Sequence, residues 1–209
     1  SPTVGLKLQI FLHSPEFAQK WPKATIYLDE GSMNNHIEKL RQGALDLCYN
    51  ALPAPDPTSQ LKLIPTSTAE IYATMFPSHP LAVFEKIDLH QLSDTDIILL
   101  DAKSCIQGQI MEEFQRLGIL PRIRSTHEQI FCMLNMVKLG NFVGFLNASD
   151  PIMRQYLTDI GLIIRPLDPP VTFATGFIVN TSRHLPKLAE ELIRFTRRLE
   201  AEEAAQKAR

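Results

Sequence analysis

Three hydroxyl side chains stand where the sequence predicts that a helix begins: Ser32, Ser104 and Thr126. Each could simply cap its helix by accepting a backbone N–H hydrogen bond, and Thr126 with Gln129 has the spacing of a capping box. The free N–H groups and partial positive charge of a helix N-terminus also suit a carboxylate or a phosphate. These residues therefore indicate either structural caps or an anion-binding site.

The common catalytic motifs do not occur in this sequence. It contains no G-x-S-x-G elbow, no phosphate-binding G-x-x-x-x-G-K-[ST] loop and no H-E-x-x-H pair. His13, His36 and His127 could meet in space, but surface or capping roles explain isolated histidines better than metal ligation. Asp46 follows a turn, where its carboxylate is better suited to accept backbone hydrogen bonds than to act as a general base. We therefore predict no catalytic site, no metal and no cofactor.

The composition limits the class of protein. The 209 residues are 44% apolar, and 21 Lys and Arg against 23 Asp and Glu give a net charge of −2. The length and apolar content favour one long domain or two small ones with a packed core. The net charge does not favour a basic surface that binds nucleic-acid phosphates. No apolar run is long enough for a membrane helix, and the first residues do not resemble a signal peptide. The three cysteines, an odd number spread far apart, favour a reducing, cytoplasmic location.

Hydrophobic periodicity predicts that strands and helices alternate along the chain. Strands are expected at 6–12, 24–28, 45–49, 61–64, 71–76, 97–100, around 123, and at 142–146, 162–167 and 173–179. Helices are expected from 32 to 42, 106 to 117, 126 to 139, from 151, and from 185 to 199, where Leu185, Leu188, Leu192, Phe195 and Leu199 form an apolar stripe. This order predicts an α/β fold with largely parallel sheets in two Rossmann-like lobes, and a ligand cleft between them at the strand ends.

Three passages together resemble one known family, the LysR-type transcriptional regulators. LRQGALDL at 40–47 is similar to the family's L-x-x-G-x-L-D-L segment. FPSHPLA at 76–82, followed by IDLHQL at 87–92, resembles its H-P-L-A passage. MVKLGNFVGFL at 136–146 resembles its V-x-x-G-x-G-h-x-h-L passage, in which h is an apolar residue. Their order and separations match too, so the resemblance covers nearly the whole chain.

The resemblance implies the effector-binding domain of such a regulator, with the fold of type 2 periplasmic binding proteins. Its first subdomain would comprise 1–69 and 173–209 and its second 70–172, joined by two crossover strands near 69–71 and 170–173. The family's winged helix-turn-helix is not expected in this chain, so DNA would be bound only through that absent N-terminal domain. The implied partners are a small-molecule effector and further copies of the chain, in a homodimer or tetramer.

Effector contacts are implied position by position. They are His13 and Ser14 after the first strand, Ser32 and Met33 at a helix start, Tyr49 and Asn50 at a strand end, Ser104, Cys105 and Gln107 after Leu100, Thr126 and His127 at a helix start, and Phe145 at a strand end.

The sequence departs from the family pattern between residues 13 and 24, where about ten residues and most of the first-lobe helix are expected to be lacking. This segment would be either a true deletion or a piece left out of the sequence. Asn141 and Asn147 also replace residues that are often small or proline in the family.

Several alternatives remain open at this stage. Tyr49 and Phe145 could be core residues rather than walls of a cleft. Cys105, near a helix start, could have a lowered thiol pKa and sense oxidants, or be a small buried apolar residue. The chain as a whole could be a solute-binding receptor of the same fold or a two-lobed enzyme, although the absent motifs disfavour the enzyme. The favoured function is sensing a small, anionic organic effector.

Overall fold

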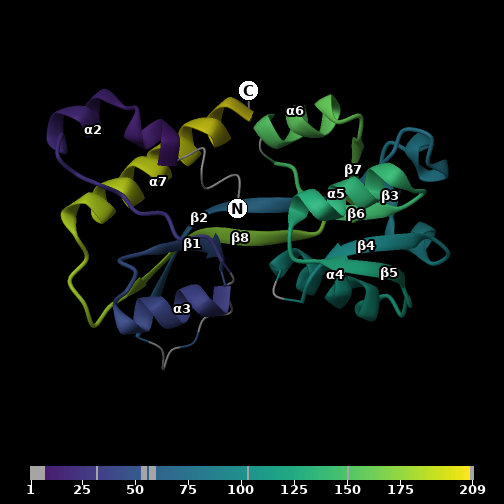
Figure 1. Cartoon of the computed structure of the whole chain (residues 1–209), viewed down its shortest axis with the longest axis horizontal. Coiled ribbons are helices and arrows are strands. Elements are labelled where there is room, and N and C mark those ends of the chain that lie inside the picture. Colours follow the sequence, from purple (N-terminus) through teal and green to yellow (C-terminus); the bar gives the residue numbers. More distant parts are fainter. Residues whose placement is uncertain are drawn as a thin grey trace. The chain divides into compact units, whose positions relative to one another are not determined.

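The computed structural model describes residues 8–31, 33–52, 56, 60–102, 104–149 and 151–207 (Figure 1). Its contacts divide the chain into two compact units. The first comprises residues 1–68 and 174–209, and the second comprises residues 69–173. The predicted borders differ from these by one residue. In the described residues, no helix has both the length and the apolar character that crossing a bilayer requires.

Most elements from α3 onward follow one another along the chain in the predicted order, whereas residues 8–31 differ from the prediction. The helices of the described residues are α2 (Pro15–Lys20), α3 (Met33–Gln42), α4 (Cys105–Arg116), α5 (Ile130–Leu139), α6 (Pro151–Asp159) and α7 (Lys187–Lys207), with short 3-10 turns at Pro80–Val83 and Leu89–Leu92. The strands are β1 (Cys48–Ala51), β2 (Leu61–Met75), β3 (Ile87–Asp88), β4 (Asp96–Leu100), β5 (Arg122–His127), β6 (Val143–Asn147), β7 (Ile163–Asp168) and β8 (Thr172–Asn180).

The first unit has a small sheet covered by helices on both faces. β8 lies between β1 and β2 and runs antiparallel to β1, with Tyr49 opposite Phe177. Leu40 of α3 is buried with Cys48 and Ile178 on one face. Ile193 of α7 is buried with Phe177 on the other face. Alternate residues of β1 and β8 therefore serve two separate apolar layers, as the period of two in a strand requires.

The prediction of a strand at 6–12 is wrong, because residues 8–12 are helical. Leu8 and Phe11 are both buried and lie three residues apart, which places them on one face of a helix. The Phe11 ring packs on Phe17 at 5.3 Å and on Phe195 of α7 at 5.2 Å between ring centroids. The apolar alternation thus belonged to a short helix that docks on α7.

The predicted strand 24–28 is also wrong, since these residues have no regular secondary structure. Tyr27 is 88% exposed and Leu28 is 66% exposed, so the apolar side chains that suggested a strand find no core among the described residues. Most of the first-lobe helix between 13 and 24 was expected to be lacking, but this segment contains the six-residue helix α2.

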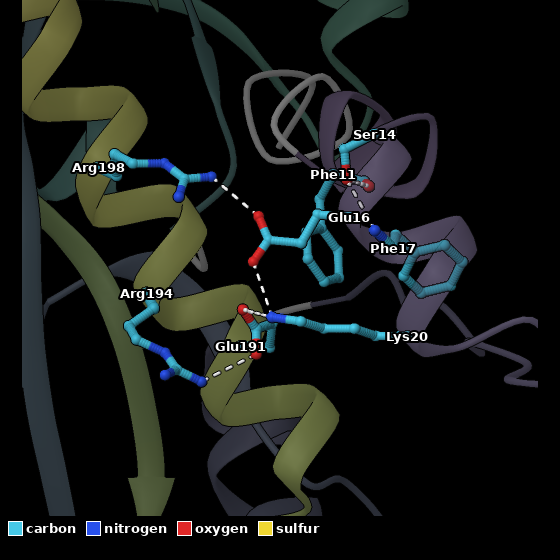
Figure 2. A network of polar contacts seen from close by, with 8 residues as sticks. All are labelled: Phe11, Ser14, Glu16, Phe17, Lys20, Glu191, Arg194 and Arg198. Atoms are coloured by element: carbon cyan, nitrogen blue, oxygen red, sulfur yellow. Dashed lines mark hydrogen bonds and ion pairs between the residues drawn. The ribbon is translucent and has the colours of Figure 1, made fainter.

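A network of charged side chains fastens α2 to α7 (Figure 2). The Glu16 carboxylate accepts from Lys20 at 3.0 Å and from Arg198 at 3.1 Å. Lys20 also donates to Glu191 at 3.3 Å, and Arg194 donates to the same carboxylate at 2.9 Å. Hydrogen bonds from Lys20 and Arg198 lower the pKa of Glu16 from its ordinary value of 4.5 to about 2.

This pKa predicts how the stability of the first unit depends on pH. A carboxyl group whose pKa is depressed by folding stabilises the folded state above its unfolded pKa, and the contribution is lost as the pH falls through the folded pKa. We expect thermal denaturation to show a difference between wild type and Glu16→Gln that is constant above pH 5 and shrinks between about pH 4.5 and 2. Glu112→Gln, at an exposed position on α4, is the control. A difference that does not change with pH would contradict the ion-pair assignment.

The two strand-like segments predicted at 61–64 and 71–76 are one continuous strand, β2, of 15 residues. Pro65 lies within it, where proline would ordinarily interrupt a strand. Gly176 on the neighbouring β8 approaches this point so closely that an added Cβ would lie 2.9 Å from the Pro65 Cα. The missing side chain at Gly176 therefore lets the two strands pass each other here.

The second unit has a mixed sheet, whereas largely parallel sheets were predicted. β4 is parallel to both β5 and β6, while β2 runs antiparallel to β6 on one side and to β7 on the other. β3 adds to β7 in parallel. The antiparallel contribution comes from β2, which enters from the first unit instead of following a crossover helix.

Helices cover both faces of this second sheet. On one face Ile110 and Phe114 of α4 pack against Ile97 and Phe145. On the other face Leu134 of α5 belongs to a cluster completed by α6. Figure 1 shows α4 and α5 on opposite sides of β4. The predicted α4 stripe and its end at Gly118, which has a φ of 67°, are confirmed.

The prediction that a helix begins at Thr126 is wrong. β5 continues through Thr126 to His127, and α5 begins at Ile130 with Gln129 as its N-cap residue. The spacing of Thr126 and Gln129 imitates a capping box, but the pairing of β5 with β4 runs to the end of both strands and keeps Thr126 extended. The apolar stripe of α7 is also displaced, because Ala189, Ile193 and Thr196 are its most buried residues.

Candidate functional site

In the second unit, two neighbouring parallel strands end together and each leads toward a helix. Leu100, the last residue of β4, pairs with His127, the last residue of β5. The Asp101 N–H donates to the His127 carbonyl oxygen at 2.9 Å, so the strand ends stay together into the loops. α4 begins five residues after Leu100, and α5 begins three residues after His127. Their N-terminal N–H groups therefore lie at the same edge of the sheet, where open α/β sheets bind ligands.

The first turn of α4 contains an unformed capping box. Ser104 and Gln107 have the spacing in which a hydroxyl and a carboxamide would bond each other's backbone N–H groups. Ser104 makes no side-chain capping bond, and its own N–H donates to the Asp101 carbonyl oxygen at 2.9 Å. The Gln107 Oε1 is enclosed without a hydrogen-bond partner. The Ser104 hydroxyl is thus left without a capping bond, and the enclosed Gln107 oxygen is a buried acceptor without a partner among the described residues.

The start of α5 is similar in one respect. Gln129 is its N-cap residue and makes no side-chain capping bond. Two helix starts without side-chain caps thus lie in one unit, each following one of two adjacent strand ends. Such an arrangement can bind a carboxylate or a phosphate through N–H groups.

Cys105 lies at the first position of α4, but the expectation of a lowered thiol pKa is wrong. Burial raises the pKa of Cys105, and its backbone N–H contacts offset that effect only in part. Burial likewise raises the pKa of Cys48 to about 11. Because the thiolate is the reactive form, burial makes both thiols less reactive. Cys105 therefore acts as a small apolar side chain at this edge.

His127 and Thr126 lie on β5 at the same edge. The Nε2 of His127 lies 2.9 Å from the Ser125 hydroxyl, and the His127 side chain is half-buried. Thr126 is exposed. His13 and His36 belong to the other unit, where His36 contacts Asp29 at 3.1 Å. The structure thus gives no support to the grouping of His13, His36 and His127.

Phe145 does not line an open surface. It is 1% exposed and packs edge to face on Phe114, with 6.2 Å between ring centroids. All its cluster partners belong to the second unit. Of the two interpretations given for this residue, the structure supports the core one.

In the first unit, Tyr49 takes part in a cluster of hydroxyl groups. Its hydroxyl lies 3.2 Å from the hydroxyls of both Thr66 and Thr175, and Ser67 lies 2.9 Å from Thr175. The Tyr49 ring packs edge to face on Phe177, with 4.9 Å between centroids. The sequence pattern did not single out Thr66, Ser67 or Thr175, because they come from two strands more than 100 positions apart. Only the pairing of β8 with β2 brings them together.

The remaining predicted contacts of the first unit have other environments. Asn50 accepts a hydrogen bond from the Ala51 N–H at 2.8 Å, and Met33 at the start of α3 packs against the cluster around Leu40. Ser32 lies outside the described residues.

His13 and Ser14 were assigned because a strand was expected before them, and that basis is wrong. Both lie between two helical segments. The Ser14 hydroxyl accepts from the Phe17 N–H at 3.1 Å and donates to the Phe11 carbonyl oxygen at 2.7 Å. Ser14 is therefore the N-cap of α2, and its hydroxyl is already occupied.

Comparisons with known proteins agree with this architecture. Residues 11–201 match the family model of the LysR substrate binding domain. A probable hydrogen peroxide-inducible genes activator from Mycobacterium avium is 28% identical over 109 residues, which is 52% of this chain and 34% of that protein. The chain spans about half the length, or less, of most of the curated relatives it matches.

Solved structures share the fold. The effector binding domain of QuiR, in complex with shikimate, superposes with a TM-score of 0.80 at 17% identity, covering 96% of this chain and 91% of that one. The regulatory domain of CcmR from Synechocystis, in complex with 2-PG, gives 0.78 at 17% identity, covering 95% and 91%. Because the family model matches most of this chain, the chain belongs to the LysR substrate-binding domain family.

Proposed function

We propose that this chain is the ligand-sensing domain of a LysR-type transcription regulator, and that its effector is a small organic anion. The observation that carries the proposal is the unformed capping box of Ser104 and Gln107. A carboxylate or phosphate would bind at the N-terminus of α4, where the Ser104 hydroxyl would donate to it.

The relatives support this chemistry. The ligands named for QuiR and CcmR, shikimate and 2-PG, both carry negative charge at neutral pH. In the first unit, Tyr49 with its hydroxyl cluster, Asn50 and Met33 stay predicted effector contacts. Thr126 and His127 would border the effector from β5.

The domain would couple effector binding to DNA binding and would not catalyse a reaction. An effector that binds one arrangement of the units more tightly than another shifts the equilibrium toward it, typically by about 1–3 kcal/mol. A DNA-binding domain N-terminal to this chain would respond to that shift in the cytoplasm. No catalytic grouping in the sequence offers an alternative reaction, so a solute-binding receptor is the remaining second candidate for this fold.

The first test is the substitution Ser104→Ala. Removing an N-cap serine usually costs about 1 kcal/mol, but Ser104 makes no capping bond, so we expect the unfolding free energy to change by much less than that. Calorimetric titration with shikimate, 2-PG and simple carboxylates should instead show about tenfold weaker binding of the bound compound.

The control is Ser93→Ala, which removes a hydroxyl that donates only to the His90 carbonyl oxygen in the same unit. It should leave binding unchanged. If Ser104→Ala lowers stability by the full value of a cap and leaves binding intact, Ser104 is structural and the proposed anchor is wrong.

We also propose that the chain forms a homodimer, or a tetramer of two such dimers, with α3 of one copy packing near residues 126–139 of its partner. The support is the exposure of apolar side chains on α5, where Phe131 is 52% and Leu139 is 83% exposed. Sedimentation at micromolar concentrations should show dimers. Monomers alone for wild type would contradict the assignment.

A further inference from the structure

Strand β1 of the first unit has a paired neighbour on one side only, in the part of the chain that the structure describes. It pairs with β8, and the N–H of Leu52, one residue beyond the strand, donates to the Ala174 carbonyl oxygen at 2.8 Å. Because alternate residues of an antiparallel strand bond to the same neighbour, Asn50 also faces β8, whereas the backbone groups of Tyr49 and Ala51 point to the other edge. There the Ala51 N–H bonds to the Asn50 side chain at 2.8 Å. β1 therefore has an open edge to which a further strand can bond.

Residues 24–28 have the exposure pattern of a strand that lacks a neighbour. Ala24 and Ile26 are half-buried, while Thr25 and Tyr27 are exposed. This period of two is that of an extended strand. Leu28 continues the side of Ala24 and Ile26, yet it is 66% exposed. The segment thus has one apolar side that the described residues do not cover completely.

The helices on either side of this segment in the sequence lie on opposite faces of the first unit's sheet. Residues 8–12 and α2 lie on the α7 face, where the Phe11 ring packs on Phe195. α3 lies on the other face, where Leu40 is buried with Cys48 of β1. The chain therefore runs from a helix on one face, through residues 24–28, to a helix on the other face and then into β1.

We propose that residues preceding Ser1 in a longer protein contribute a β-strand that lies between β1 and residues 24–28. A crossover between parallel strands of one sheet is right-handed, so crossovers on opposite faces step along the sheet in opposite directions. The added strand, followed by α2 on the α7 face, steps one way to residues 24–28. α3, on the other face, steps back beyond the added strand to β1. The added strand therefore lies in the middle and bonds to the open edge of β1.

A preceding segment fits this place better than a second copy of the chain. The chain spans about half the length of most curated relatives it matches, so such proteins contain further residues. Ser1 belongs to the first unit, which also contains β1. A second copy would have to insert its strand between two segments that α3 already joins. The inference concerns how the first unit is completed and does not depend on the proposed effector.

Hydrogen exchange followed by NMR tests the proposal on two proteins. They are the 209-residue chain and the same chain extended by the residues that its gene encodes before Ser1. We expect the Tyr49 N–H to exchange at least about tenfold more slowly in the extended chain. The Asn50 N–H, which faces β8, should be protected in both and serves as the internal control.

The substitution Ala51→Pro gives an independent readout. Proline removes an N–H that points to the open edge, and an edge strand tolerates this loss. We expect the melting temperature of the 209-residue chain to stay close to its wild-type value, and that of the extended chain to fall by about 4 °C or more. Asn50→Pro removes an N–H that faces β8 and should lower the melting temperature of both proteins.

Three results would overturn the proposal. The first is equal exchange of the Tyr49 N–H in the two proteins, and the second is an equal effect of Ala51→Pro on both. The third is slow Tyr49 exchange in the 209-residue chain that depends on its concentration, which would place a second copy at the edge. If Ala51→Pro does not fold in either protein, the exchange of the two wild-type proteins still decides.

Discussion

Replacing Phe114 by alanine is expected to lower the unfolding free energy of the second unit by about 3–5 kcal/mol. Phe114 belongs to α4, and its fully buried side chain lies between this helix and the sheet. Its ring packs edge to face on that of Phe145. The substitution removes both the transfer free energy of the ring and the aromatic contact, and it leaves a cavity that the surrounding strands cannot close. Chemical denaturation monitored by circular dichroism measures the loss.

Leu120→Ala provides the matched control, since Leu120 is in the same unit but 89% exposed. It should change the unfolding free energy by less than about 0.5 kcal/mol. The Phe145→Ala variant should resemble Phe114→Ala in stability. Equal, small effects at positions 114 and 120 would show that α4 does not pack as described.

The substitution Gly176→Ala should destabilise the first unit by about 3 kcal/mol, the upper end of the range for overpacking. The added methyl group would meet the Ile64 carbonyl oxygen and the Pro65 Cα on β2. Both are backbone atoms, so no side-chain rotation can relieve the contact. Either β8 would move away from β2 or the pairing around the hydroxyl cluster would be lost.

Gly108→Ala is the control for this second prediction. Gly108 lies inside α4, and nothing approaches within 4 Å of the position of its missing Cβ. Because alanine favours a helix interior over glycine by about 1 kcal/mol, the variant should be slightly more stable than wild type. Thermal melts of both variants under identical conditions separate the effect of crowding from the effect of adding a methyl group.

The parts of the fold that follow from sequence are those in which local pattern and packing agree. In α4 the apolar residues recur with helical spacing, Gly118 ends the helix with a positive φ, and β4 is a short buried run of apolar residues. Each of these signals is contained within about ten neighbouring residues. The resemblance to the LysR family was likewise carried by short passages, and it is confirmed.

The errors arose where a distant partner decides between two local possibilities. The pattern of residues 6–12 predicted a strand, yet residues 8–12 are helical. In this helix the Phe11 ring packs on the ring of Phe195, far along the chain. Thr126 stays extended because β4 pairs with it through its last residues. Among the candidate site residues, Ser104 could be found as a predicted helix start and Gln107 through the family resemblance, whereas the bonds missing between them, and the hydroxyls around Tyr49, depend on tertiary structure.

The long strand β2 belongs to both units and sets the register of strand pairing in each of them. Its early residues adjoin β8 in the first unit, and Ile71–Met75 pair with β6 in the second. Inserting or deleting one residue near its middle would turn every following side chain to the opposite face, so that the polar Thr74 would exchange places with its apolar neighbours. The length of this segment should therefore be held constant by natural selection, while the loops around it are free to vary.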